Sequence, residues 1–409
     1  MKIVVIGGGA AGFFSALTAK ESNPDAKILL IERSVKLLSK VRISGGGRCN
    51  VTHACFDPKL LVQNYPRGKK ELLGPFSRFQ PKDTVAWFQA RGVKLKKEKD
   101  GRMFPNTDSS DTIINCFLKE AKQLKVDILT QTKLASIEKK QSKFHLLIKN
   151  GSPILADRVI LATGSSPVGW EIAKNLGHKI NTPIPSLFTF NIPSFQLAPL
   201  AGVSVDRVKV SLKNSKLGQT GPLLITHWGF SGPAALKLSA FGARFLAENN
   251  YKSELVIDWL PDVSLNELQN QIEFECTSHP KKHLKNLQIP LPKSLLKELY
   301  LRANLQNDSF LRLISKKDIT RLLEVLKQDV YEVIGKTTNK EEFVTCGGIK
   351  LSEVNFKTME SKLCEDLFFC GEILDIDGVT GGFNFQNAWT TGWIAGKSAS
   401  SNKIDLLQK

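Results

Sequence analysis

Three glycines near the N-terminus have the spacing of a turn that binds the phosphates of a dinucleotide. Gly7, Gly9 and Gly12 form a G-x-G-x-x-G pattern that follows a short apolar segment and opens a helical pattern. The first glycine permits a tight turn, the second lets the backbone approach a pyrophosphate, and the third allows close packing of helix on strand. The first N–H groups of a helix lack intrahelical partners and can bind phosphate. We therefore assign Gly7, Gly9, Ala10, Ala11 and Gly12 to a dinucleotide site.

An acidic residue stands where such a site holds the ribose. Glu32 lies 20 residues after Gly12, at the end of the second apolar segment, 26–33. Its carboxylate can accept hydrogen bonds from ribose hydroxyls, and Arg33 beside it is assigned to the same site. The strand–helix–strand–acid context makes the glycine pattern far more specific, but it does not distinguish NAD from FAD.

Two later segments distinguish these cofactors. Residues 158–164 (RVILATG) and 368–375 (FFCGEILD) are apolar and run into glycine, and they resemble the second and third signatures of the glutathione-reductase-like FAD-binding fold. No second G-x-G-x-x-G lies between a strand pattern and a helix pattern, so we expect FAD as resident cofactor and NAD(P)H as a transient reductant. The residues assigned to FAD here are Ala162, Thr163, Gly164, Gly371 and Glu372.

Alternating strand and helix patterns surround these motifs. Residues 2–6 and 26–33 have the apolar character of buried strands, and a helical pattern lies between them. Residues 126–149 alternate like the strands of a meander, and further helices are expected over 82–91, 111–124 and 385–400. Because the chain starts and ends in one α/β layout, the pattern indicates a nucleotide-binding domain that carries an insertion.

The middle of the chain has a different character. Residues 203–260 contain alternating segments typical of a small β domain, whereas 264–335 are mostly helical and rich in Lys and Leu. We predict an α/β protein in which the FAD-binding domain comprises 1–188 and 344–409, the inserted β domain 189–262 and the inserted helical domain 263–343.

Composition narrows the class of protein. With 409 residues, 42% hydrophobic and 23% charged, the chain fits a globular protein of two or three domains. The longest uncharged run, 180–205, is interrupted by prolines, and the N-terminal apolar run is too short for a signal peptide, so neither a membrane span nor export is expected. Seven cysteines without paired spacing suit the reducing cytoplasm, and no His or Cys spacing indicates a metal site. No stable protein partner is evident.

The net charge of +18 is concentrated in one stretch. Residues 33–102 hold 17 Lys and Arg against 5 Asp and Glu, a net charge of +12. Such a stretch can create a local field that attracts a polyanion, and nucleic acid is then the leading partner. A merely solvated basic surface is the alternative.

Further motifs carry a family resemblance. Residues 44–52 (SGGGRCNVT), 226–236 (THWGFSGPAAL), 345–349 (TCGGI), 357–362 (KTMESK) and 371–389 (GEILDIDGVTGGFNFQNAW) resemble the BaiN/RdsA family of FAD-dependent oxidoreductases. The resemblance covers essentially the whole chain. It implies a discontinuous Rossmann-type FAD-binding domain with an inserted β-barrel-like domain and a small helical domain.

The resemblance also assigns two segments to the flavin. Consecutive glycines in the 44–50 loop let backbone N–H groups approach the cofactor, and the 375–387 segment would close over the flavin from the C-terminal side. The helix that begins there could stabilise the negative charge of reduced flavin. One departure is that the loop after ATG is shorter than in many relatives. The assigned residues are Lys40, Ser44, Gly46, Gly47, Arg48, Cys49, Asn50, Asp375, Gly381, Gly382, Asn384 and Phe385.

Two substrate classes are associated with this family. One is uridine in ribosomal RNA, reduced at its C5=C6 bond to dihydrouridine, and the other is small enones or amino ketones. The basic segment 33–102 is contiguous with the flavin loop and favours ribosomal RNA. A third hypothesis is that the protein binds flavin and RNA but catalyses no reaction of its own.

The reduction of uracil also needs a general acid to protonate C5. The candidates are Cys49, His227 and Glu372. For Cys49 a buried thiol that packs a tight loop is the commoner interpretation, and for His227 a core histidine bonded to the backbone is equally plausible. Cys49 and Cys55 have five residues between them, which argues against a disulfide reductase with the C-x-x-C or C-x-x-x-x-C spacing.

Overall fold

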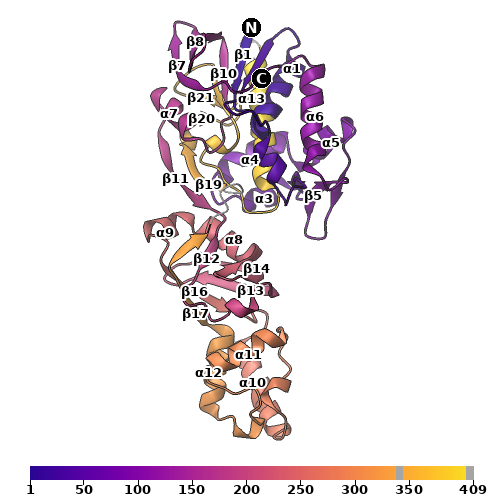
Figure 1. Cartoon of the computed structure of the whole chain (residues 1–409), viewed down its shortest axis with the longest axis vertical. Helices are drawn as coiled ribbons and strands as arrows, with labels where there is room; N and C mark the ends of the chain where they lie inside the picture. The colour runs from indigo at the N-terminus through magenta and orange to yellow at the C-terminus, as the bar shows by residue number, and fades with distance from the viewer. Residues whose placement is uncertain (338–343, 402–409) are drawn as a thin grey trace. The chain divides into compact units, whose positions relative to one another are not determined.

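The structure is a computed structural model that describes residues 1–337 and 344–401. The chain divides into two compact units (Figure 1). Unit 1 comprises Met1–Pro185 and Lys340–Lys409, and unit 2 comprises Ser186–Asn339. The finer division of the insertion into a β domain and a helical domain stays a prediction.

Unit 1 is built on a seven-stranded sheet with the strand order β20-β21-β22-β10-β1-β2-β6. Strands β6, β2, β1, β10 and β22 run parallel, and β1 pairs with β2 on one side and β10 on the other. Their side chains are mostly buried, as expected for a parallel sheet covered on both faces. The strands are β1 (Lys2–Ile6), β2 (Lys27–Ile31), β6 (Asp127–Leu129), β10 (Arg158–Leu161), β20 (Val354–Asn355), β21 (Glu360–Ser361) and β22 (Leu367–Phe369).

Two helices from opposite ends of the chain pack against each other in unit 1. Helices α1 (Ala10–Ser22) and α13 (Phe383–Ser400) make the most extensive helix–helix contact of the described chain. Glycine permits the close approach, because a Cβ built on Gly392 would lie 2.9 Å from the carbonyl oxygen of Ala11. The indole of Trp389 on α13 lies 5.5 Å from the ring of Phe14 on α1, centroid to centroid.

The predicted elements of unit 1 occur close to their expected positions. The helices predicted over 82–91, 111–124 and 385–400 are α5 (Pro81–Ala90), α6 (Ser110–Gln123) and α13. The meander predicted over 126–149 is correct for β7 and β8, which continue into β9, but β6 pairs parallel with β2 in the main sheet instead. The other elements of unit 1 are α2 (Ser39–Ile43), β3 (Thr52–His53), α3 (Pro58–Leu61), α4 (Lys69–Arg78), β4 (Leu95–Lys97), β5 (Arg102–Pro105), β7 (Leu134–Lys140), β8 (Lys143–Ile148), β9 (Ile154–Ala156), α7 (Pro167–Asn175), β11 (Ile180–Ser186) and β19 (Val344–Ile349).

Unit 2 contains a second seven-stranded sheet, with the order β17-β16-β13-β14-β15-β12-β18. Its neighbouring strands pair antiparallel, and one apolar core extends from the sheet to the helices. The strands are β12 (Thr189–Asn191), β13 (Ser204–Leu212), β14 (Gly218–Ile225), β15 (Gly229–Ser231), β16 (Ser253–Asp258), β17 (Asp329–Val333) and β18 (Gly335–Thr337). The helices are α8 (Gly232–Phe241), α9 (Ala243–Glu248), α10 (Leu265–Ser278), α11 (Lys293–Arg302) and α12 (Lys316–Lys327).

The structure adds detail to the predicted insertion at two places. The stretch 203–260 also contains α8 and α9, and the helical stretch ends with α12 at Lys327, so the segment after it forms β17 and β18. Burial alternates residue by residue along β17, which is the strand period of two rather than a helical period. Strands β17 and β18 pair with opposite ends of the sheet and are separated only by Ile334. No hydrogen-bonded closure between β17 and β18 is recorded over the described residues.

Within 1–337 and 344–401, no helix is long and apolar enough to cross a membrane.

Candidate cofactor site

The carboxyl ends of four parallel strands bring the predicted motifs to one edge of the sheet in unit 1. Gly7 follows β1, Glu32 follows β2, Ala162 follows β10, and Cys370 with Gly371 follows β22. The strand order reverses direction at β1, because β2 and β10 lie on opposite sides of it. Open α/β sheets bind ligands outside the carboxyl ends of their strands at such a point.

The glycine turn has the geometry that a dinucleotide requires. Gly7 has φ +114°, and its N–H donates to the carbonyl of Ile31 at 2.8 Å. A Cβ on Gly12 would collide with the carbonyl oxygen of Gly7, whereas a Cβ on Gly9 would meet nothing within 4 Å. Helix α1 begins without a capping side chain and without an acid in its first turn. The open space at Gly9 and the uncapped helix end therefore fit a pyrophosphate.

Glu32 is held rigidly beside this turn. Its Oε2 accepts from the N–H of Gly8 at 2.8 Å and its Oε1 from the N–H of Ser34 at 2.8 Å. Each carboxylate oxygen has a second lone pair, so the group can still accept from ribose hydroxyls. The neighbouring Arg33 is exposed.

The 44–50 loop is also open on one side. Gly45, Gly46 and Gly47 have φ of +58°, +69° and +84°, and a Cβ on Gly46 or Gly47 would meet nothing within 4 Å. With its amide oriented to satisfy both neighbours, Asn50 donates to the Thr52 carbonyl and accepts from the Gly382 N–H, each at 3.0 Å. Asn50 thus connects this loop to the start of α13.

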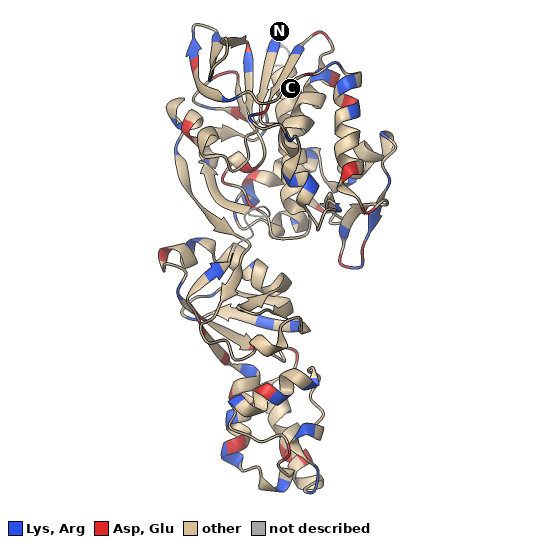
Figure 2. Ribbon diagram, viewed as in Figure 1, with Lys and Arg blue, Asp and Glu red and all other residues tan. Residues whose placement is uncertain are grey.

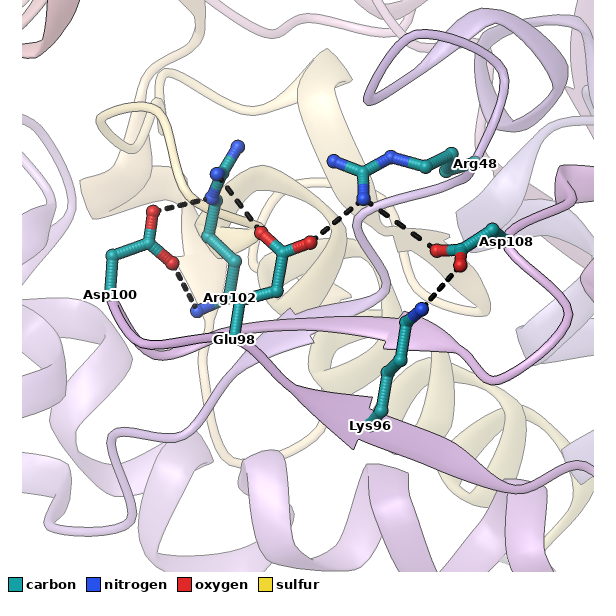
Figure 3. Close-up of polar contacts among 6 residues, drawn as sticks. All are labelled: Arg48, Lys96, Glu98, Asp100, Arg102 and Asp108. Carbon is teal, nitrogen blue, oxygen red and sulfur yellow. Dashed lines mark hydrogen bonds and ion pairs between the residues drawn. The ribbon is translucent and has the colours of Figure 1, made fainter.

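Arg48 belongs to a charged network on the β4–β5 hairpin (Figure 3). Its Nη1 lies 2.7 Å from Glu98 Oε1 and 3.6 Å from Asp108 Oδ1, and its guanidinium lies 4.0 Å from the centroid of the Phe104 ring. The hydrogen bond to Glu98 raises the pKa of Arg48 further above its usual value. The network therefore holds the loop against the hairpin, and the contact of Arg48 with the cofactor stays a prediction. Lys96 pairs with Asp108, and Arg102 pairs with Glu98 and Asp100.

A second polar cluster joins the ends of β10 and β22. Lys40 on α2 forms an ion pair with Glu372 Oε2 and donates to Ser165 Oγ at 3.1 Å. The other oxygen, Glu372 Oε1, accepts from the N–H of Thr345 at 3.1 Å. The structure thus brings together Lys40 and Glu372, which were assigned to the cofactor separately. It adds Ser165, which follows the ATG motif, and Thr345, the first residue of the 345–349 motif.

The C-terminal segment is stabilised mainly by its own polar groups. The Asn384 side chain accepts from the Gly378 N–H at 2.8 Å and donates to the Gly378 carbonyl at 2.9 Å. Asp375 Oδ2 accepts from Asn181 Nδ2 at 2.6 Å. The ring of Phe385 stacks on Trp389 with 5.5 Å between centroids. These three residues therefore shape the segment, and their contact with flavin stays a prediction.

The turn before α13 also consists of glycines, but it packs closely against the protein, because a Cβ on Gly382 would lie 2.6 Å from the carbonyl oxygen of Thr52. Gly381 and Gly382 have φ of +124° and +92°, and α13 begins without a capping side chain or an acid in its first turn. Asp377 is fully buried and pairs with Arg67, an anchor that the sequence analysis did not identify.

Several buried polar atoms of unit 1 have no protein partner. Among the described residues these include Thr163 Oγ1 after β10, Thr345 Oγ1 on β19 and Asn387 Oδ1 in α13. Buried polar groups are almost always hydrogen-bonded, so unsatisfied ones beside the glycine turns fit a polar ligand such as a flavin dinucleotide.

The three candidate proton donors are divided between the two units. Cys49 is completely buried in unit 1, and burial raises the pKa of its thiol to about 12. Glu372, also in unit 1, is paired with Lys40. His227 belongs to unit 2 and lies on the exposed turn between β14 and β15.

Trp228, the residue after His227, was not among the candidate residues predicted from the sequence. The side chain of Trp228 is 69% exposed, although the turn itself is fixed, with Thr226 N–H donating to the Gly229 carbonyl at 2.8 Å. The signal available in the sequence was an indole at a turn between two strand patterns.

Comparison with known proteins agrees with this geometry. The family described as HI0933-like protein Rossmann domain matches residues 1–398. The chain belongs to this family of flavin-type oxidoreductases. It is 30% identical over 413 residues to a ribosomal RNA dihydrouridine synthase of Escherichia coli, covering 98% of each chain. It is 27% identical over 410 residues to a 3-dehydro-bile acid delta(4,6)-reductase of Clostridium scindens, covering 98% of this chain and 99% of that one.

Solved structures support the same fold. A 3-ketosteroid-Δ4-(5α)-dehydrogenase from Rhodococcus jostii RHA1 has a TM-score of 0.50 at 14% identity and covers 98% of this chain and 96% of its own. At this identity the likeness shows the fold alone. The Escherichia coli and Clostridium scindens relatives, each matching 98% of this chain, carry different substrates in their names, so the comparisons show a flavin-type oxidoreductase without naming its substrate.

Proposed function

We propose that this protein of the HI0933-like family binds FAD and uses NAD(P)H to reduce uridine in ribosomal RNA to dihydrouridine. The observation that carries the RNA substrate is the state of the basic segment 33–102. Seven of its 17 cations pair with carboxylates, and no carboxylate pairs with the other ten among the described residues. All ten are exposed: Arg33, Lys36, Lys59, Lys69, Lys70, Arg78, Lys82, Lys94, Lys97 and Lys99.

Exposed cations that pair with no carboxylate are available to phosphates, although Lys69 also donates to Gln63 Oε1 and Arg78 to the Lys357 carbonyl. Neutralising phosphates with Lys and Arg releases counterions, which dominates the affinity of proteins for nucleic acids. The basic positions are spread over several elements of unit 1 rather than gathered on one (Figure 2). This distribution suits an extended polyanion better than a compact uncharged enone. The name of the Escherichia coli relative supports the same substrate class.

The residues of unit 1 would hold the cofactor. The turn 7–12 and the N-terminus of α1 bind the pyrophosphate, Glu32 accepts from the ribose, and the open 44–47 loop approaches the flavin with its backbone. The uncapped N-terminus of α13 supplies positive potential. When bound, FAD supplies hydride transfer to C6 of the uracil ring.

Of the three candidate proton donors, we propose His227, on the ground of its exposure. Cys49 is buried and Glu372 is ion-paired, whereas His227 is exposed on a fixed turn and can meet a base that arrives from solvent. A flipped or unpaired uridine then receives the proton at C5. His227→Asn should retain flavin and its reduction by NAD(P)H but lose about 10²-fold or more in dihydrouridine formation. Normal turnover of this variant would eliminate His227.

The test of the function is quantitative mass spectrometry of dihydrouridine in ribosomal RNA from cells with and without the gene. Loss of the modified base, restored by the intact gene but not by Gly12→Asp, is the expected result. Unchanged dihydrouridine would contradict the proposal and leave the small-molecule reductase, which the name of the Clostridium scindens relative supports.

A further inference from the structure

A second basic site lies in unit 1 outside the segment 33–102. A surface cavity of about 490 Å³ is lined by residues from the end of α7, the start of β11 and the residue that follows β19. These three elements lie together along one side of unit 1 (Figure 1). The lining residues are Lys174, His178, Lys179, Ile180, Asn181 and Lys350.

Three lysines give the cavity its charge. Lys174, Lys179 and Lys350 are exposed, and no acidic partner is recorded for them among residues 1–337 and 344–401. The N–H of Lys350 donates to the Lys179 carbonyl at 2.9 Å, which fixes two of the three positions relative to each other. No Asp or Glu lines the cavity. Three ammonium groups around one hollow favour an anion.

Two carboxylates bond to residues that line the cavity. Glu353 Oε2 lies 3.1 Å from Nδ1 of the buried His178 and accepts from the Lys179 backbone N–H at 3.0 Å, and Asp375 accepts from Asn181. Among the described residues, no ion pair joins either carboxylate to the three lysines.

The cavity is connected to the candidate cofactor site. Asn181, which lines it, donates to Asp375 Oδ2 at 2.6 Å, and Asp375 belongs to the C-terminal segment assigned to the flavin. The Asn181–Asp375 hydrogen bond therefore connects the lining of the cavity to that segment.

We infer that this cavity binds phosphate groups of the RNA backbone, an inference that rests on the proposed RNA substrate. A nicotinamide dinucleotide also carries phosphates, but its adenine needs an apolar or aromatic wall, and Ile180 is the one apolar residue among those lining the cavity. The lysines lie outside the basic segment found in the sequence, so they add a separate set of phosphate contacts.

The test compares two triple variants of the flavin-loaded full chain. Lys174→Gln, Lys179→Gln and Lys350→Gln are combined in one, and Lys281→Gln, Lys316→Gln and Lys317→Gln in the other. The control lysines are exposed residues of unit 2 that remove the same charge. The probes are a single-stranded uridine-containing RNA, with affinity measured across salt concentrations, and NADPH and NADH, with the rate of flavin reduction measured.

We expect the cavity variant to lose about tenfold in RNA affinity at low salt and to lower the salt slope by about 2, because each phosphate contact on a single strand contributes about 0.7. The control variant should change the slope by less than one contact. Equal losses in both variants, or an unchanged slope in the cavity variant, would overturn the inference. In the cavity variant, flavin reduction by NADPH could slow more, relative to the wild type, than flavin reduction by NADH does, while RNA affinity is unchanged. That result would assign the cavity to the nicotinamide cofactor and would also overturn the inference.

Dihydrouridine formation by the wild-type protein on ribosomal RNA from cells lacking the gene separates the two hypotheses. If the wild type forms none, the proposed function fails. If the wild type forms dihydrouridine and the cavity variant matches it in both KM and salt slope, only the phosphate site fails.

Discussion

Gly9 and Gly12 lie three residues apart in one turn, yet the structure requires them for different reasons. Gly12 has no room for a Cβ because the carbonyl of Gly7 occupies that space. Gly9 has room and an extended backbone with φ −94°, which any residue adopts. Glycine is needed at position 12 for the fold and at position 9 only for a ligand.

Substitution by alanine should separate these two requirements. Gly9→Ala should change the free energy of unfolding of the apoprotein by less than about 1 kcal/mol but lower its FAD content, because the methyl group fills the phosphate-facing space. Gly12→Ala should lower the free energy of unfolding by about 1–3 kcal/mol through overpacking. Urea denaturation and flavin absorbance measure both quantities. Full FAD occupancy in Gly9→Ala would contradict the assigned pyrophosphate site.

Three buried cysteines are expected to make the free energy of unfolding depend on pH in the alkaline range. Burial raises the pKa of Cys49 and of Cys370 to about 12 and that of Cys116 to about 11. A thiol in the unfolded chain titrates near 9.0, so above that pH the folded state binds more protons than the unfolded state.

The free energy of unfolding should therefore fall as pH rises from about 9 to about 12, by at most roughly 1.4 kcal/mol per pH unit for each thiol. Urea denaturation at a series of pH values measures the slope. Cys370→Ala should flatten it, whereas Cys276→Ala, at a partly buried thiol, should do so less. An unchanged slope in Cys370→Ala would show that this thiol does not stay protonated.

At the scale of elements, the contact between α1 and α13 connects the two ends of the chain at the cofactor site. A Cβ on Gly396 would lie 2.5 Å from the carbonyl oxygen of Ser15 and 2.9 Å from the Cβ of Thr18. Both glycines of α13 that face α1 are buried, so the helices touch backbone to backbone. This packing sets where the uncapped ends of both helices lie within unit 1.

Gly396→Ala should destabilise unit 1 despite the better helix propensity of alanine. Propensity favours alanine by about 1 kcal/mol, whereas overpacking against a backbone oxygen costs about 1–3 kcal/mol. The expected result is a lower Tm together with reduced flavin content. Lys397→Ala on the exposed side of α13 is the control and should leave both unchanged. A stabilised Gly396→Ala would mean that α13 can shift away from α1 without loss.

At the scale of the whole molecule, the two units carry different parts of the proposed chemistry. Every residue assigned to FAD belongs to unit 1, whereas the exposed His227 and Trp228 belong to unit 2. An aromatic ring can stack on an unpaired base, a contact worth about 1–3 kcal/mol. We therefore expect unit 2 to affect the substrate and not the cofactor.

Trp228→Ala should retain wild-type flavin content and NAD(P)H-dependent flavin reduction but weaken RNA binding by about 5- to 100-fold. Phe274→Ala is the matched control, because Phe274 is 65% exposed on α10 of the same unit. Binding of single-stranded RNA and quenching of indole fluorescence provide the measurements. If both variants bind RNA equally well, Trp228 is not a stacking residue.

The Rossmann-type fold and the glycine turn could be predicted from the sequence because their signals are local: a strand period, a helix period and glycines at fixed spacing. Lys40 and Glu372 were assigned separately from motifs, and their ion pair, which spans 332 residues, appears only in the structure. The return to strand after Lys327 was missed because β17 is stabilised by pairing with β16, which no local pattern shows.

The sequence could not show which charged and polar side chains already form ion pairs or hydrogen bonds within the protein. Arg48 pairs with Glu98, Asn384 bonds to Gly378, and Asn181 reaches Asp375, contacts that span up to 194 residues of sequence. A side chain's availability depends on neighbours brought close by folding, and spacing along the chain does not contain that information. The lysines around the 490 Å³ cavity illustrate this, since Lys350 joins Lys174 and Lys179 from a distant part of the chain.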